Sequence, residues 1–176
     1  MTTLLGTRGT IRNGRAVRAA SPEQGCQDCP RGTFSDLEGI PTEGNCTNCS
    51  AGFWSDVPGI TKESLCKSCD AGKYSEMPRA MSKDACLDCD PGFFSVDVAA
   101  ANVSACDACE PGFAQSQTGA VYCLPCQPGN VAPHSGSESC SPCPKNTIAS
   151  APESLSCSSC NAGEFTIGNG SVSCSK

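Results

Sequence analysis

Aromatic side chains are scarce in this sequence: six Phe, two Tyr and one Trp among 176 residues. Large aromatic and aliphatic side chains supply most of the buried apolar surface that stabilises a globular core. No apolar run approaches the roughly 20 residues that a membrane-spanning helix needs, and no helical periodicity or long strand alternation is present. The composition therefore excludes an ordinary globular core and predicts no transmembrane segment in this chain.

Catalytic motifs are also missing. His134 is the only histidine, and it stands in a predicted loop without a nucleophile or an orienting acid nearby in sequence. No phosphate-binding loop, paired carboxylate or nucleophile motif occurs. We therefore predict that the chain is not an enzyme, has no catalytic residues and uses no cofactor.

A net positive charge is found only at one end of the sequence. Residues 1–20 carry four arginines and no acid, while all eighteen Asp and Glu residues and eight of the Lys and Arg residues follow. This acidic balance argues against a nucleic-acid partner. Residues 1–25 lack the apolar core of a signal peptide, so we interpret them as a disordered basic leader or a gene-model artefact.

Cysteine is the abundant residue, with seventeen copies, and it is repeated in a fixed pattern. Each copy reads Cys-x-x-Cys, then Gly or Asn three residues later, then an apolar residue two positions further. The period is 20 residues over 26–108 and 17 residues over 109–176, which gives four modules in each segment. The pattern predicts a small disulfide-rich tandem repeat, mostly coil with short β bridges, extended as a rod or superhelix. Because Cys26 and Cys174 stand at incomplete repeats, we expect a fragment of a longer array.

The Gly or Asn predicts a left-handed turn, and the apolar residue after it predicts a plug beneath the disulfide. A second Gly, ten residues after the second cysteine of the pair, predicts another turn at Gly39, Gly59, Gly119, Gly136 and Gly170. Arg79, Ala99 and Glu153 replace that Gly, so we expect this second turn to be irregular. The segment that is shortened in the later modules should be an exposed loop.

Two disulfide schemes fit the cysteine register. One links alternate cysteine pairs by crossed bonds, such as Cys26 to Cys46 and Cys29 to Cys49. The other, which we favour because identical modules should repeat identical bonds, closes each module by itself and leaves Cys26 without a partner. Its bonds are Cys29 to Cys46, Cys49 to Cys66, Cys69 to Cys86, Cys89 to Cys106, Cys109 to Cys123, Cys126 to Cys140, Cys143 to Cys157 and Cys160 to Cys174.

The segments Cys29-Pro-Arg-Gly-Thr-Phe-Ser and Cys89-Asp-Pro-Gly-Phe-Phe-Ser resemble the ephrin-receptor-like cysteine-rich repeat, and more distantly the tumour necrosis factor receptor module. The resemblance covers residues 26–174. Its last three modules differ by having Val131 and Ile148 in place of the aromatic residue and Asn146 in place of Gly. The resemblance implies an extracellular array that spaces domains or contacts proteins, as a stalk, adhesion region or receptor ectodomain.

An intracellular zinc array is the alternative, since C-x2-C-x16-C-x2-C is also a zinc-ribbon spacing. A secreted signalling ligand is a third hypothesis. We favour the extracellular interpretation, with no metal site, because this many cysteines without a core indicates an oxidising compartment. An extracellular location implies a protein partner, which the sequence does not identify, and glycosylation at the sequon residues Asn102 and Asn169. The sequence leaves the oligomeric state and membrane anchoring of the parent protein open.

Overall fold

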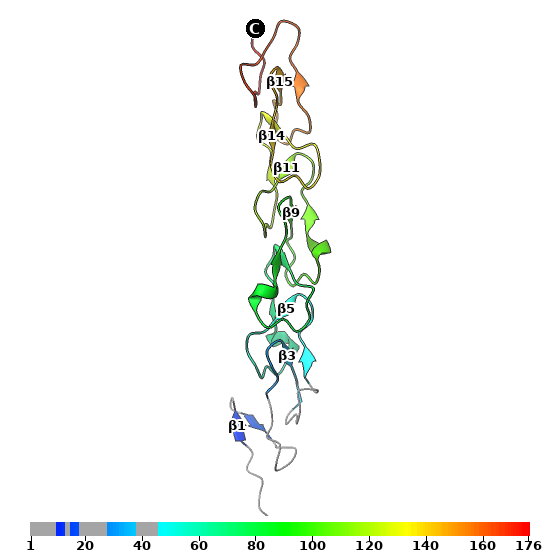
Figure 1. The fold of residues 1–176 in the computed structure, drawn as a ribbon, viewed down its shortest axis with the longest axis vertical. Helices are drawn as coiled ribbons and strands as arrows, with labels where there is room; N and C mark the ends of the chain where they lie inside the picture. Colours follow the sequence, from blue (N-terminus) through cyan, green and yellow to red (C-terminus); the bar gives the residue numbers. More distant parts are fainter. Residues whose placement is uncertain (1–9, 13–14, 18–27, 38–45) are drawn as a thin grey trace, which may run out of the picture. The chain divides into compact units, whose positions relative to one another are not determined.

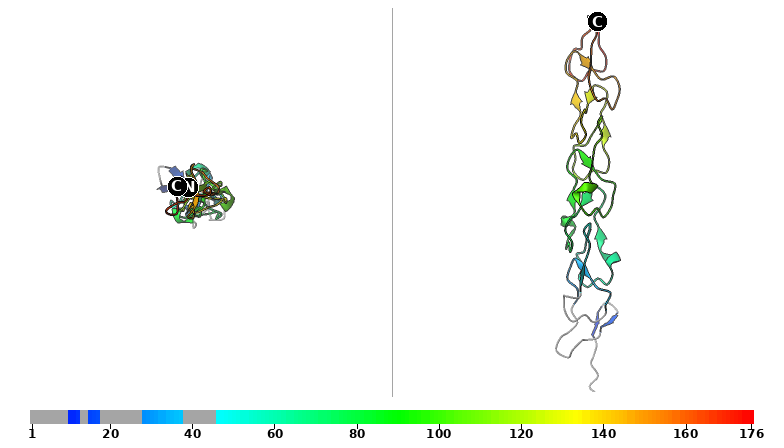
Figure 2. Two further views of the ribbon diagram at one scale, coloured as in Figure 1. Left: turned by 90° about the horizontal axis from the view of Figure 1, so that it is seen from above. Right: turned by 90° about the vertical axis from the view of Figure 1, so that its right-hand side faces the viewer.

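A computed structural model describes residues 10–12, 15–17, 28–37 and 46–176 (Figure 1). These residues form turns, coil and short antiparallel strand pairs, and no α-helix occurs among them (Figure 2). They divide into two compact units: unit 1 contains the chain up to residue 69 together with 75–85, and unit 2 contains 70–74 and 86–176. The predicted small disulfide-rich repeat with short β pairs is confirmed.

One two-stranded hairpin recurs in each of the first seven modules, which we number from the opening cysteines Cys29, Cys49, Cys69, Cys89, Cys109, Cys126, Cys143 and Cys160. The two residues after the turn pair with the two residues inside the next Cys-x-x-Cys, so strand and cysteine motif share the same residues. The pairs are β3 (Thr33–Phe34) with β4 (Thr47–Asn48), β5 (Phe53–Trp54) with β6 (Lys67–Ser68), β7 (Lys73–Tyr74) with β8 (Leu87–Asp88), β9 (Phe93–Phe94) with β10 (Asp107–Ala108), β11 (Phe113–Ala114) with β12 (Leu124–Pro125), β13 (Asn130–Val131) with β14 (Ser141–Pro142), and β15 (Thr147–Ile148) with β16 (Ser158–Ser159).

The basic segment 1–25 contributes one further hairpin, in which β1 (Thr10–Arg12) pairs with β2 (Arg15–Val17). The other residues of that segment lie outside the described residues.

Among the described residues, three 3-10 helices distinguish the longer modules 2, 3 and 4 from the shorter ones. They are η2 (Glu63–Leu65), η3 (Lys83–Ala85) and η4 (Val103–Ala105), and each ends immediately before a closing cysteine. None of their residues is buried, which confirms that the segment of variable length is exposed. The later modules have turns and bends at this place, so the loss of three residues corresponds to the loss of one 3-10 turn.

The predicted left-handed turn is present in every module. The glycines have φ between +76° and +89°, and Asn146 has φ +69°. Close packing also requires glycine at several of these positions. A Cβ at Gly129 would lie 2.1 Å from the carbonyl oxygen of Gly170, which belongs to the module two steps further along the chain.

In modules 2 to 8, whose second turn the structure describes, this turn is regular, contrary to the expectation from its sequence. Arg79, Ala99 and Glu153 have φ of +61°, +57° and +57°, close to the +67° of Gly119. The physical reason is a hydrogen bond from this turn to the opening cysteine of the preceding module: Glu153 N–H donates to Cys126 O at 2.9 Å, as Gly119 N–H donates to Cys89 O at 2.8 Å. Tertiary pairing thus imposes a conformation that costs a non-glycine residue about 1 kcal/mol.

Sulfur and small side chains form the core. The opening cysteines of modules 2 to 7 are at most 1% exposed, and so are Ser55, Ser75 and Ser95 beside the plugs. The plugs themselves are mostly half-buried, and Phe165 is 48% exposed. Cys49 belongs to a cluster with Ile60 against which Phe34, the plug of the preceding module, packs, and Cys143 clusters with Val131, the plug of its preceding module. In these two places the core is therefore shared between consecutive modules instead of closed within one.

Backbone hydrogen bonds join consecutive modules within each unit. In unit 1, the Gly32 N–H donates to Ser55 O at 3.0 Å, and in unit 2 the Gly92 N–H donates to Gln115 O at 2.7 Å. The carbonyl oxygens of the same turn residues accept a hydrogen bond from the opening cysteine of the next module, as Gly92 O does from Cys109 N–H at 2.8 Å. A module consequently satisfies its backbone groups only with a neighbour present.

Candidate functional site: disulfide framework and an aromatic hollow

Sixteen cysteines are disulfide-bonded. The bonds close individual modules and do not cross between alternate cysteine pairs. Cys69 and Cys86 are bonded as well, and Cys26 lies outside the described residues. The individual bonds are Cys29 to Cys46, Cys49 to Cys66, Cys89 to Cys106, Cys109 to Cys123, Cys126 to Cys140, Cys143 to Cys157, and Cys160 to Cys174.

The zinc alternative requires Cys46 and Cys49 to serve one ion. In the structure they belong to the bonds of two different modules. Across residues 28–37 and 46–176, no group of three or more His, Cys, Asp or Glu side chains is arranged to hold a metal ion. The described part of the chain also contains no helix with the length and apolar character needed to cross a bilayer.

The other sequence-predicted residues are on the surface. Asn102 is exposed and caps η4, since its side-chain oxygen accepts a hydrogen bond from the Ser104 N–H at 3.0 Å. Asn169 is exposed in the last module. His134 is exposed in a turn, where its carbonyl oxygen accepts a hydrogen bond from the Ser137 hydroxyl at 2.7 Å. None of the three side chains lines the hollow described next.

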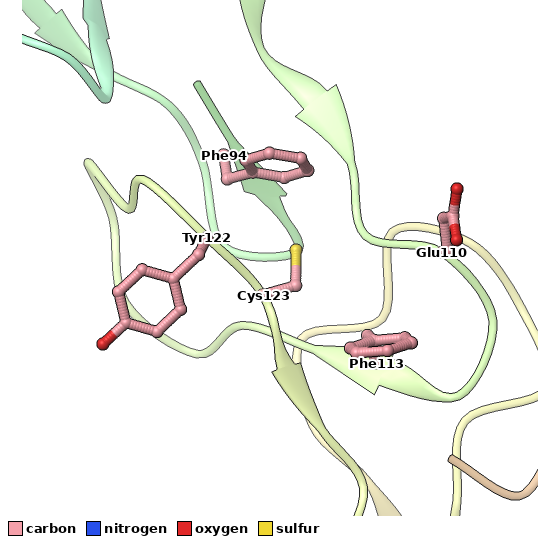
Figure 3. Close-up of a pocket in the computed structure, with 5 residues that line it drawn as sticks. All are labelled: Phe94, Glu110, Phe113, Tyr122 and Cys123. Carbon is pink, nitrogen blue, oxygen red and sulfur yellow. The ribbon is translucent and has the colours of Figure 1, made fainter. Parts of the chain in front are cut away.

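A surface hollow of about 220 Å³ lies in unit 2, where modules 4 and 5 meet. It is lined by Phe94 from β9, Phe113 from β11, Tyr122, Cys123 and Glu110. Figure 3 shows the three rings around the Cys123 sulfur, with the Glu110 carboxylate at the edge. Phe94 and Phe113 are half-buried, whereas Tyr122 is 61% exposed, so an aromatic surface is open to solvent.

Gln115 fixes the segment that carries Tyr122. It occupies the position of the buried serines in the earlier modules, is 7% exposed, and donates from its Nε2 to the Tyr122 carbonyl oxygen at 2.9 Å. Its Oε1 accepts the Gln117 N–H at 3.0 Å. Both ends of its buried amide are therefore satisfied, and the amide ties the Tyr122 backbone to the β11 side of module 5.

In unit 1, the amino group of a lysine of this chain lies over the ring of the plug residue Trp54. Lys67 Nζ lies 4.6 Å from the centroid of the Trp54 ring and donates to Asp56 Oδ1 at 2.8 Å. Hydrogen bonding to Lys67 is the main cause that lowers the pKa of Asp56. Trp54 and Lys67 are cross-strand partners in the β5–β6 pair, so the hairpin register brings them together.

Sequence reasoning located the cysteines, turns and plugs but missed the hollow, Gln115 and the Lys67–Trp54 contact. The replacement of Ser by Gln at position 115 was the visible signal, since the other modules carry Ser, Ala or Thr at this position. The hollow had no sequence signal, because it is built by residues of two modules.

Residues 129–176 match the family model described as tyrosine-protein kinase ephrin type A/B receptor-like. Such a cysteine-rich module is a non-catalytic ectodomain type. The match covers the modules in which Val131 and Ile148 replace the aromatic residue and Asn146 replaces Gly; the left-handed φ of Asn146 shows that the turn is kept there. No curated protein matches the chain.

Proposed function

We propose that this chain is an extracellular or cell-surface array of disulfide modules that contacts other proteins, and that it carries out no catalysis. The observation that carries the proposal is that the opening cysteines of modules 2 to 7 are buried and bonded, while large apolar side chains are only half-buried. A chain held together in this way requires oxidised sulfur, and an oxidising compartment keeps it so.

The repeated architecture supports a contact role. Each unit is stabilised by bonds between consecutive modules, so side chains at the hairpins and loops remain available to a partner. The match to ephrin-receptor-like modules supports a place in an ectodomain. We propose two series of modules, 26–108 and 109–176, with native bonds as described above.

Glycosylation of Asn102 and Asn169 forms part of the proposal. Both side chains are exposed in sequons, which secretory enzymes modify on accessible loops. Expression in the secretory pathway of a eukaryotic cell should add glycan at both sites, and deglycosylation with mass analysis should convert the two residues to Asp. Substituting Ser104 and Ser171 by Ala provides the control, because it removes the sequons but keeps both asparagines.

Thiol counting tests the function as a whole. The secreted chain is alkylated without reduction and its zinc content is measured. Sixteen cysteines should resist alkylation, peptide mapping should give the within-module bonds, and zinc should be absent. A compact protein with alkylatable cysteines and stoichiometric zinc would overturn the proposal in favour of an intracellular zinc array. A receptor-activating activity of the purified chain would favour a secreted signalling ligand.

A further inference from the structure

We propose that the hollow lined by Phe94, Phe113 and Tyr122 binds one Lys or Arg side chain of a basic segment in a partner protein. This inference rests on the proposed function, since it names the chemistry of the partner that the array contacts. The occupant follows from three features of the hollow: its aromatic rings, its negative charge and the lack of any Lys or Arg among the described residues that line it.

The first argument is the comparison with Trp54. Trp54 and Phe94 hold the same position in modules 2 and 4, five residues after the opening cysteine. The cross-strand partner of Trp54 is Lys67, whose amino group lies over the ring and bonds Asp56. In module 2 the fold therefore holds a cation against the plug ring, between that ring and a carboxylate.

At Phe94 the cross-strand partner is Asp107 instead of a lysine. Cβ atoms of directly opposed residues lie about 5 Å apart, so a carboxylate takes the place from which Lys67 reaches Trp54. The plug in module 4 consequently has an acid beside it and no cation from its own hairpin.

The charge around the hollow points to the same occupant. Residues 84–144 contain no Lys or Arg, but they contain seven Asp and Glu residues. Glu110, on the rim, is exposed, and it forms no ion pair with any Lys or Arg that the structure describes. The negative potential of this stretch favours the approach of a basic partner and disfavours an acidic one.

Size and geometry restrict the occupant to a single side chain. A volume of about 220 Å³ is too small for a helix or a folded loop, but it accommodates one long side chain. The faces of aromatic rings attract a guanidinium or ammonium group, and the methylene stem packs on the remaining apolar surface. Gln115 holds the Tyr122 segment in place, so the hollow is formed before the partner arrives.

Two phenylalanines, an acid and a tyrosine occur together at these positions in only one place in the sequence. In module 4 the residues equivalent to Phe113 and Glu110 are Phe93 and Asp90, but Ala105 stands where module 5 has Tyr122. Tyr122 is therefore the residue that turns a repeated hairpin into a three-sided aromatic hollow.

The test is a titration of the secreted, disulfide-bonded chain with an acetylated, amidated heptapeptide of Gly and Ser around one central arginine. Proton NMR follows the arginine side chain, whose methylene signals should move upfield in the ring currents of the hollow. Replacing the arginine by neutral citrulline should weaken binding about ten-fold, and a central lysine should retain binding. Raising sodium chloride from 50 to 300 mM should also weaken it.

Variants locate the site. Tyr122→Ser, at a largely exposed side chain, and Glu110→Gln should each weaken binding three-fold or more. Phe94→Leu removes one of the three rings and should reduce the upfield shifts. Glu138→Gln is the matched control, because it removes the same charge from an exposed residue outside the hollow and should leave binding unchanged. Unreduced peptide maps of every variant establish that the fold is intact.

Several outcomes would overturn the inference while leaving the proposed function in place. These are no binding by a chain with intact disulfides, equal weakening by Glu138→Gln and Glu110→Gln, or tighter binding of a peptide with central phenylalanine. Self-association that Tyr122→Ser abolishes would make a second copy the occupant and would equally refute it. Reactive thiols in the wild-type chain would instead refute the proposed function.

Discussion

Gly129→Ala isolates the contribution of packing between modules. Alanine at φ +88° carries a conformational cost of about 1 kcal/mol. The new Cβ would also lie 2.1 Å from the Gly170 carbonyl oxygen, so the backbone has to move by about 1 Å. Such overpacking costs about 1 to 3 kcal/mol, and it disturbs the bonds from Gly129 N–H to Ala149 O and from Cys143 N–H to Gly129 O. We expect a local destabilisation of about 3 kcal/mol.

Gly163→Ala is the matched control. Gly163 has φ +83°, but a Cβ there would meet nothing within 4 Å, so only the conformational cost of about 1 kcal/mol applies. Native-state hydrogen exchange measures both variants, at the Cys143 amide for Gly129→Ala and at the Glu164 amide for Gly163→Ala. The difference of about 2 kcal/mol corresponds to roughly 30-fold faster exchange in Gly129→Ala. Equal acceleration in the two variants would show that backbone conformation alone selects glycine and would refute the packing argument.

Three further perturbations test the second turn, the Lys67 contact and the support of the hollow. Arg79→Gly should stabilise unit 1 by about 0.5 kcal/mol, because relief of left-handed strain exceeds the entropy gained by the unfolded chain; a lower denaturation midpoint would contradict this. The pKa of Asp56 is lowered from its usual 3.8, so its pairing with Lys67 stabilises the fold above about pH 4, and this stabilisation is lost as the pH falls through the lowered pKa. Lys67→Gln should raise the titration midpoint of the Asp56 carboxyl group in carbon NMR. An unchanged midpoint would refute the assignment of the shift to Lys67. Gln115→Ala should destabilise module 5 by about 2 kcal/mol and speed amide hydrogen exchange around Tyr122, whereas Gln117→Ala should do neither. Equal effects of the two variants would show that the Gln115 amide does not support the Tyr122 segment.

Prediction from sequence succeeded where a residue type strongly favours one backbone conformation. Glycine and asparagine at the third position after each cysteine pair indicated a left-handed turn, and each adopts it, Asn146 included. It failed at Arg79 and Glu153, where the side chain argues against positive φ but a hydrogen bond to the opening cysteine of the preceding module imposes it. At such a residue the preference for negative φ is worth about 1 kcal/mol, and the backbone hydrogen bond that requires positive φ contributes about as much. The residues next to it in sequence therefore do not determine the sign of φ.

The amino-acid sequence by itself determined the module: its cysteines, its turn residue, its plug and its short hairpin, because these depend on spacing within about twenty residues. Only the tertiary structure decided which groups of different modules meet. The approach of Gly129 to Gly170, the Lys67 amino group over Trp54, and the gathering of Phe94, Phe113 and Tyr122 around one disulfide all depend on how one module is seated on the next. That seating is set by backbone hydrogen bonds and close packing between modules, and these interactions have no residue-specific signature in the sequence.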